Sequence, residues 1–204
     1  LVKIGDNVFG SDTALTSITI PSTVTSIASN AFNGCTAMTS ITVASGNTAF
    51  ASVDGVLYNA AKTSLIAVPA GKTSVNVPGT VKTIPSLAFG AKITSVTLNE
   101  GTTKLEKWAF INCKNMTSIT IPSSVTTINT HAVGYYHANA EATDDDTKIQ
   151  GFVIKGYTGS AAQTYANKNG FTFQSIGTSC THTWGTTPSW TWDGISSAKA
   201  TFTC

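Results

Sequence analysis

The stretch LTSITIPSTVTSIASNAFNGCTA, residues 15–37, decides the fold of this chain. Ile18 and Ile20 alternate with hydroxyl residues, which is typical of a strand with one buried face. Pro21 has no backbone N–H to donate, so the strand ends there. A second apolar pair, an Ala-Phe pair on a short helical or turn-like arc and a cysteine complete the unit: Val24 and Ile27, Ala31 and Phe32, and Cys35.

The same pattern recurs along the chain with a spacing of 23 residues. The positions Leu1, Ile4, Phe9 and Leu15 return as Val24, Ile27, Phe32 and Met38. Well-kept units begin at Leu15, Lys72, Ile93 and Met116. A period in the twenties is typical of stacked repeats, in which each unit buries its apolar side against its neighbours. The sequence therefore predicts a mostly β, leucine-rich-repeat-like solenoid with short helical or turn arcs.

Composition excludes two classes of partner. Only 11% of the 204 residues are charged, all 12 basic residues are Lys, and the net charge is +2. Planar, bidentate recognition of phosphate is chiefly a task of Arg, so a nucleic-acid partner is not expected. No apolar run approaches the ~20 residues that span a bilayer, so we expect no membrane insertion within this fragment.

Two interruptions break the repeat, at residues 44–71 and 134–148. In the first, Asp54-Gly55 separates two apolar runs and predicts a tight hairpin turn. The second lacks apolar periodicity and is predicted to be a loop. It carries Tyr135, Tyr136, His137, Glu141 and Asp144-Asp145-Asp146.

A capping unit is predicted at residues 151–176, so the solenoid domain is expected to cover 1–177. Within the cap, Ser160 is expected to cap a helix over 161–169 that ends at Gly170, between strands at 151–155 and 171–173. Residues 178–204 are expected to begin a small all-β module with Cys, His and Trp, cut short at its end. The chain opens inside a repeat, so we expect it to be a fragment of a longer protein.

The repeat motifs resemble the BspA-like leucine-rich repeat family. The resemblance is carried by LTSITIP at 15–21 with its counterpart from Met116, by the Ala-Phe pairs followed by Cys35 and Cys113, and by DGVLY at 54–58. The resemblance implies an extracellular or cell-surface bacterial protein used in adhesion or host interaction. It also implies a protein or glycan of the host or a neighbouring cell as partner, and supplies no catalytic residues and no cofactor.

The four cysteines fall into two groups. Cys35 and Cys113 each lie three residues after a Phe, at the same repeat position of distant coils. Coils rise ~4.8 Å each, so these two cannot approach within the ~7 Å between Cα atoms that a disulfide needs, and are predicted to be buried thiols. For Cys180, His182 and Cys204, three interpretations stay open: an incomplete zinc site, a Cys180–Cys204 disulfide, or incidental thiols in a truncated module.

The histidines near the second interruption allow two interpretations. His131, beside Ala132, is expected to be structural. His137 with Asp144, Asp145 and Asp146 has the oxygen ligands of a cation site, but the spacing fits no EF-hand loop. We therefore favour an acidic, solvated loop.

The remaining candidate site is the outward face of the strands, which carries Thr, Ser and Asn in register. A ladder of hydroxyls favours β structure by itself, and it also offers a shallow uncharged surface to a partner. The candidate ligand residues are Thr19, Thr42, Asn76, Thr97 and Thr120, with Tyr135, Tyr136 and His137 from the second interruption.

No sequence motif of catalysis occurs: Gly-x-Ser-x-Gly, His-Glu-x-x-His and a phosphate-binding glycine loop are all lacking. The favoured hypothesis is a non-enzymatic interaction module of the bacterial surface. The alternatives are a structural spacer that displays another domain, and a targeting module joined to an enzyme outside this fragment.

Overall fold

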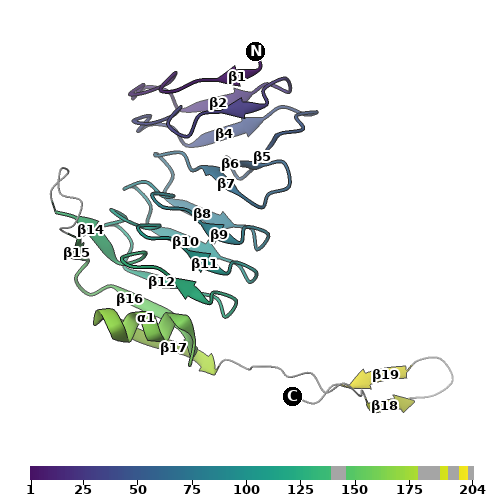
Figure 1. The fold of residues 1–204 in the computed structure, drawn as a ribbon, viewed down its shortest axis with the longest axis vertical. Helices are drawn as coiled ribbons and strands as arrows, with labels where there is room; N and C mark the ends of the chain where they lie inside the picture. Colours follow the sequence, from purple (N-terminus) through teal and green to yellow (C-terminus); the bar gives the residue numbers. More distant parts are fainter. Residues whose placement is uncertain (139–145, 179–188, 193–197, 202–204) are drawn as a thin grey trace.

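The computed structural model of this protein describes residues 1–138, 146–178, 189–192 and 198–201. Successive coils of the chain stack along the long axis of the molecule, and a helix covers the C-terminal end of the stack (Figure 1). Each coil has strands on two sides, joined by turns. The predicted leucine-rich-repeat-like solenoid is confirmed.

The longer strands form one side of the solenoid and pair in parallel within three separate sheets. Ser17 lies beside Ser40 and Ile18 beside Ile41, so neighbouring strands hold equivalent repeat positions. Apolar side chains point inward and hydroxyls outward, because successive side chains of a strand point to opposite faces. These strands are β2 (Ser17–Ile20), β4 (Ser40–Val43), β8 (Ser74–Val77), β10 (Ser95–Leu98), β12 (Ser118–Thr120), β16 (Val153–Thr158) and β17 (Thr172–Thr178).

A second side of the coils is built from shorter parallel strands. β1 (Lys3–Ile4) pairs with β3 (Ser26–Ile27). Further along, β9 (Thr83–Ile84), β11 (Lys104–Leu105) and β13 (Thr127–Ile128) form one sheet in that order. The arcs that follow these strands are turns rather than helices.

The core consists of two apolar clusters, which meet at β6 (Val56–Asn59). Leu57 packs into the N-terminal cluster with Ile20, Met38 and Ile41. Val56 and Tyr58, on the opposite face of the same strand, pack into the C-terminal cluster. The first interruption is therefore a layer of the core that joins two blocks of coils.

This layer is a three-stranded antiparallel sheet of β5 (Phe50–Val53), β6 and β7 (Leu65–Ala67). Asp54 and Gly55 join β5 to β6 with φ angles of 48° and 75°. Positive φ at both central residues is the signature of a type I′ turn, which suits the twist of paired strands. The predicted hairpin turn is confirmed.

The second interruption is also a hairpin at its flanks, and the prediction of a loop is wrong there. β14 (Tyr135–His137) pairs antiparallel with β15 (Asp146–Lys148), with His137 beside Asp146. Apolar periodicity could not reveal these strands, because the side chains of β15 are polar. Their position is set instead by contacts with neighbouring coils.

The cap contains α1 (Ala161–Asn169), the one helix of the described residues, and α1 ends at Gly170 in the left-handed conformation, as predicted. The cap at its start differs from the prediction. The Ser160 hydroxyl makes no capping hydrogen bond, and the side chain of Gln163 instead accepts one from the N–H of Gly159 at 2.7 Å. The extended backbone at Ser160 still begins the helix.

In the tail, β18 (Ser189–Trp192) pairs antiparallel with β19 (Ala198–Thr201). Cys180, His182 and Cys204 lie outside the described residues, so the three interpretations of this group stay predictions, as does the domain boundary at 177/178. Within the described residues, no helix is long and apolar enough to cross a membrane.

Candidate interaction surface

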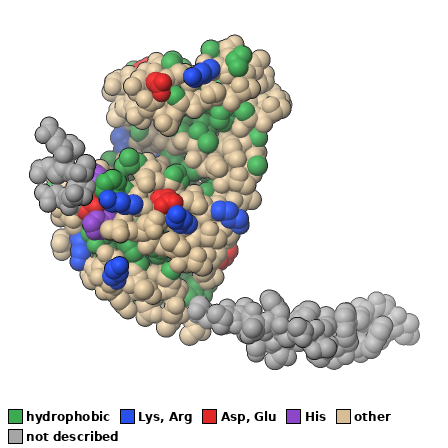
Figure 2. Space-filling view, in the orientation of Figure 1, with side chains coloured by type: hydrophobic (Ala, Val, Ile, Leu, Met, Phe, Trp, Pro, Cys, Tyr) green, Lys and Arg blue, Asp and Glu red, His purple; other side chains and the backbone are tan. Residues whose placement is uncertain are grey.

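Most outward positions of the long strands are exposed, as the sequence predicts. Figure 2 shows one face of the molecule, on which charged side chains are sparse and scattered. The ladder is divided, however, because the sheet β5–β6–β7 lies between β4 and β8. The five candidates therefore fall into two groups. Thr19 and Thr42 lie before this sheet, and Asn76, Thr97 and Thr120 lie after it.

Some outward polar side chains bond one another. The hydroxyl oxygens of Thr19 and Thr42 lie 2.8 Å apart, which is a hydrogen bond between neighbouring coils. Asn76 accepts a hydrogen bond of 2.7 Å from the side-chain amide of Asn99. These contacts bind one coil to the next, so part of the ladder has a structural role.

Thr97 and Thr120 differ from these pairs. Both side chains are exposed, and neither hydroxyl bonds to any described residue. Thr97 lies beside Asn76 in the β8–β10 pair, and Thr120 lies beside Lys155 in the β12–β16 pair. Among the five candidates, these two hydroxyls are therefore the ones free to donate and accept hydrogen bonds with a partner.

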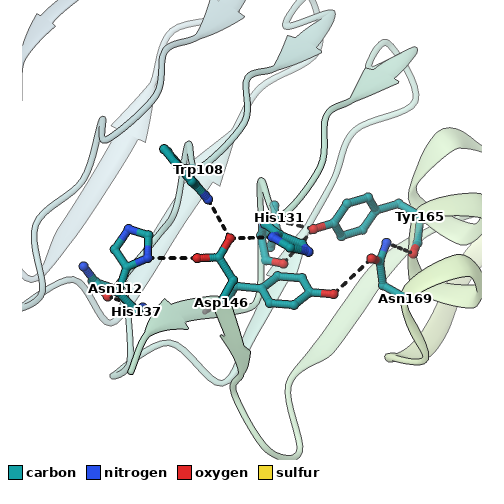
Figure 3. A network of polar contacts seen from close by, with 9 residues as sticks. Trp108, Asn112, His131, His137, Asp146, Tyr165 and Asn169 are labelled. Carbon is teal, nitrogen blue, oxygen red and sulfur yellow. Dashed lines mark hydrogen bonds and ion pairs between the residues drawn. The ribbon is translucent and has the colours of Figure 1, made fainter. Parts of the chain in front are cut away.

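The hairpin β14–β15 is anchored by a buried carboxylate. The side chain of Asp146 is 1% exposed and meets three rings (Figure 3). Trp108 Nε1 donates to Asp146 Oδ2 at 2.6 Å, and His131 Nδ1 contacts the same oxygen. His137 Nδ1 lies 2.8 Å from Asp146 Oδ1. The interpretation of Asp146 as a solvated residue is therefore wrong, whereas the cation site stays a prediction, because Asp144 and Asp145 lie outside the described residues.

The repeat itself brings Trp108 and His131 together. They lie two residues before Phe110 and Val133, at equivalent positions of neighbouring coils. Both have a left-handed backbone, with φ of 62° and 52°. The 23-residue spacing between them was a signal that the sequence contained, but it did not reveal that Asp146 would bind both.

The charge of Asp146 is stabilised by these rings. Burial alone would raise the pKa of its carboxyl, but the hydrogen bond from Trp108 and the contacts with His131 and His137 outweigh burial and lower the pKa. Tyr135, close to this carboxylate, has a raised pKa because of burial and the negative charge of Asp146. Asp146 therefore holds its negative charge in the buried site.

A second set of hydrogen bonds joins the hairpin region to the cap (Figure 3). The Tyr135 hydroxyl donates to Asn169 Oδ1 at 3.0 Å, and Asn169 donates to the backbone carbonyl of Tyr165 at 2.8 Å. The Tyr165 hydroxyl in turn donates to the carbonyl of Val133 at 2.9 Å. Tyr165 and Asn169 were not among the residues predicted from sequence, because their partners lie more than thirty positions away.

The three candidates of the second interruption are thus less accessible than predicted. Tyr135 is 4% exposed. The prediction that Tyr135 lies on the surface is therefore wrong. Tyr136 and His137 are half-buried. The ammonium of Lys114 lies 4.1 Å from the centre of the Tyr136 ring. One face of Tyr136 is therefore already occupied by a cation–π contact.

The cysteines within the described residues match the prediction. Cys35 and Cys113 are free and buried. Burial raises the pKa of Cys113 to about 12, so this thiol stays protonated. In residues 1–138 and 146–178, no group of three or more His, Cys, Asp or Glu side chains is arranged to hold a metal ion. Asp144 and Asp145 lie outside the described part of the chain.

Comparison with known families agrees with this geometry. The model of the BspA type leucine rich repeat region matches six copies, over residues 2–71 and 70–143, which is more than half of the chain. The chain belongs to the BspA-type leucine-rich repeat family. The resemblance stated from its motifs is therefore confirmed. None of the curated proteins compared with this BspA-type chain matches it.

Two solved structures are similar to this BspA-type chain. A leucine-rich repeat protein of Eubacterium ventriosum is 28% identical with a TM-score of 0.55, over 76% of this chain and 40% of its own. A leucine rich cell surface protein of Faecalibacterium prausnitzii is 21% identical with a TM-score of 0.53, over 87% of this chain and 52% of its own. The second likeness supports the fold alone. The chain spans about half or less of the length of these relatives.

Proposed function

We propose that this chain is a non-enzymatic interaction module of the bacterial surface, which binds a protein or glycan of a host or neighbouring cell through its strand face. The observation that supports this proposal is the pair of exposed hydroxyls on Thr97 and Thr120, which no described residue satisfies. Uncharged hydroxyls on a rigid surface suit hydrogen bonding to glycan hydroxyls or to peptide groups. The proposed surface location rests on membership of the BspA-type family.

The rigidity of the solenoid supports the same proposal. The parallel strands hold Asn76 beside Thr97, and the inner residues of β8 and β10 are buried. A partner would therefore meet side chains whose backbone is already ordered. Such preorganisation reduces the entropy lost on binding.

The test is a glycan array together with a panel of purified extracellular proteins, probed with the full chain. For any partner found, the double variant Thr97→Val/Thr120→Val should weaken binding by about 30-fold, since two hydrogen bonds contribute about 1 kcal/mol each. Val keeps the shape and the strand preference of Thr. Thr13→Val, at an exposed position outside the strands, is the matched control.

Unchanged binding by the double variant would contradict the assignment to the strand face. Failure of the wild-type chain to bind any member of either panel would instead favour the alternative function, a spacer that displays another domain.

A further inference from the structure

The short strand β13 is the edge of its sheet. It pairs with β11 on one side, and no described strand pairs with its other side. The equivalent side of each earlier strand is paired with the strand of the following coil: β9 pairs with β11, and β11 pairs with β13. At the level of the next coil the chain forms α1 instead of a short strand, so the regular addition of strands stops at β13.

The edge of β13 carries backbone groups that an added strand would use. The carbonyls of Thr103, just before β11, and of Leu105 accept hydrogen bonds from Thr127 N at 3.2 Å and Asn129 N at 3.0 Å. The equivalent carbonyls at the next strand belong to Thr126, just before β13, and to Ile128. Because backbone groups alternate in direction along a strand, these carbonyls and the Ile128 N–H point away from β11. No described residue bonds to them.

A groove lies along this edge. Between β13 and α1 the structure has a cavity of about 630 Å³, within the size range of ligand sites. Its lining includes Thr126 and Ile128 on the strand side, with Thr164 and Lys168 on the helix side. A second hollow of about 300 Å³ continues along the helix past Asn129. The groove is therefore elongated along the exposed side of α1.

The chemistry of the groove suits an extended peptide with an acidic side chain. The carbonyls of Thr126 and Ile128 are two residues apart, about 6.6 Å along a strand, which is the spacing of alternate N–H groups of an extended chain. Lys168 has no ion pair with any described residue, so its ammonium is available to a carboxylate. The hydroxyls of Ser123 and Thr164 flank the groove.

We infer that the groove between β13 and α1 binds an extended, acidic peptide segment of a partner protein, which adds to the edge of β13 as a further strand. Sheet edges recognise peptides in this way through main-chain hydrogen bonds, with side-chain pockets supplying specificity. A glycan has no row of donors at this regular spacing. The groove shares no residue with the hydroxyl ladder, so this inference and the proposed function can fail separately.

The chain itself suggests a probe. Residues 101–107 contain β11, which pairs with β9; Lys104 N donates to the carbonyl of Lys82 and Glu106 N to that of Ile84. These carbonyls are equivalent to those of Thr126 and Ile128. The probe is the end-capped peptide GTTELEG, which is this segment with its two lysines replaced to make it acidic.

The experiment is a titration of the isotope-labelled full chain with GTTELEG, followed by amide NMR shifts. We expect saturable shifts at residues 126–129 and along α1. Methylation of the peptide nitrogen at the place of Glu106 removes the donor to Ile128 and should weaken binding by about fivefold, since one hydrogen bond contributes about 1 kcal/mol. The neutral peptide GTTQLQG should bind more weakly than GTTELEG.

Two protein variants separate the groove from general charge attraction. Lys168→Glu should weaken GTTELEG binding, and Lys62→Glu, the same change at an exposed position of a distant coil, should not. The inference is overturned by the absence of saturable shifts, by equal binding of the methylated peptide, or by equal effects of the two lysine variants. Occupation of the groove by a neutral oligosaccharide without peptide binding would also overturn it.

Discussion

Trp108 and His131 lie at equivalent positions of neighbouring coils and both contact Oδ2 of Asp146. The repeat places Trp108 and His131 at equivalent positions, and the hairpin β14–β15 supplies the carboxylate that both contact. A carboxylate from outside the repeat is thus held by two rings that the repeat places side by side. Asp146 thereby fixes the start of β15 against the solenoid.

Asp146→Asn should destabilise the protein by about 1.5–3 kcal/mol, the range for hydrogen bonds to a charged group. Asn keeps the shape of the side chain but removes the charge that faces His131 and His137. It also replaces one carboxylate oxygen, a hydrogen-bond acceptor, with an NH₂ group that can only donate. Urea unfolding would measure the loss. Asp6→Asn, at an exposed position, is the control and should change stability little. Equal effects of the two changes would contradict the anchoring role of Asp146.

Stability should also fall in acid because of Asp146. The folded-state pKa of this carboxyl is lowered, so its contribution is present above the unfolded pKa of about 3.9 and is lost as pH falls through the folded value. The urea midpoint, followed from pH 6 downward, should therefore decline below about pH 4. Asp146→Asn should show a shallower decline than the wild type in that range.

Glu100 provides a comparison for the acid titration. Burial would raise the pKa of its carboxyl, but hydrogen bonds from Ser123 and Ser124 lower it. Glu100→Gln should also make the acid decline shallower. A decline identical in the wild type and both variants would show that neither carboxyl governs acid stability.

Phe89→Ala should cost about 3–5 kcal/mol, because a large buried ring is replaced by a cavity. Phe89 is 5% exposed, and its ring stacks on Phe110 with 4.6 Å between centroids. Thermal or urea unfolding measures the loss. Ile176→Ala, at a side chain that is 44% exposed, should cost much less. A loss below about 1 kcal/mol for Phe89→Ala would contradict its core position.

Leu87→Gly should stabilise the protein by up to about 1 kcal/mol, because a left-handed backbone costs a side-chain-bearing residue roughly 1–2 kcal/mol, part of which the added freedom of glycine in the unfolded chain offsets. Leu87 has φ of 58° and is 64% exposed, so little packing is lost. Val8→Gly, at a residue that is 58% exposed and outside the left-handed region, should have the opposite sign. Urea unfolding of both variants and the wild type measures the two changes in stability. A loss of stability in Leu87→Gly would contradict the prediction.

The fold was predictable from local patterns. The alternation around Ile18, the strand end at Pro21 and the Asp54-Gly55 turn each depend on near neighbours in the sequence. The capping helix was predictable for the same reason, although the Gln163 cap was not. The site was predictable in part: the outward positions of Thr97 and Thr120 followed from strand alternation. The ladder's division into two groups did not.

By itself, the sequence determined the coil, its inward and outward faces and the stacking of equivalent positions, because a period repeated along the chain needs one local geometry. Only the tertiary structure decided that β6 joins two clusters of the core, that Asp146 lies buried among Trp108, His131 and His137, and that β13 ends its sheet beside α1. These features depend on contacts between segments whose sequences share no pattern. Which segments meet depends on which surfaces the stacked coils bring together.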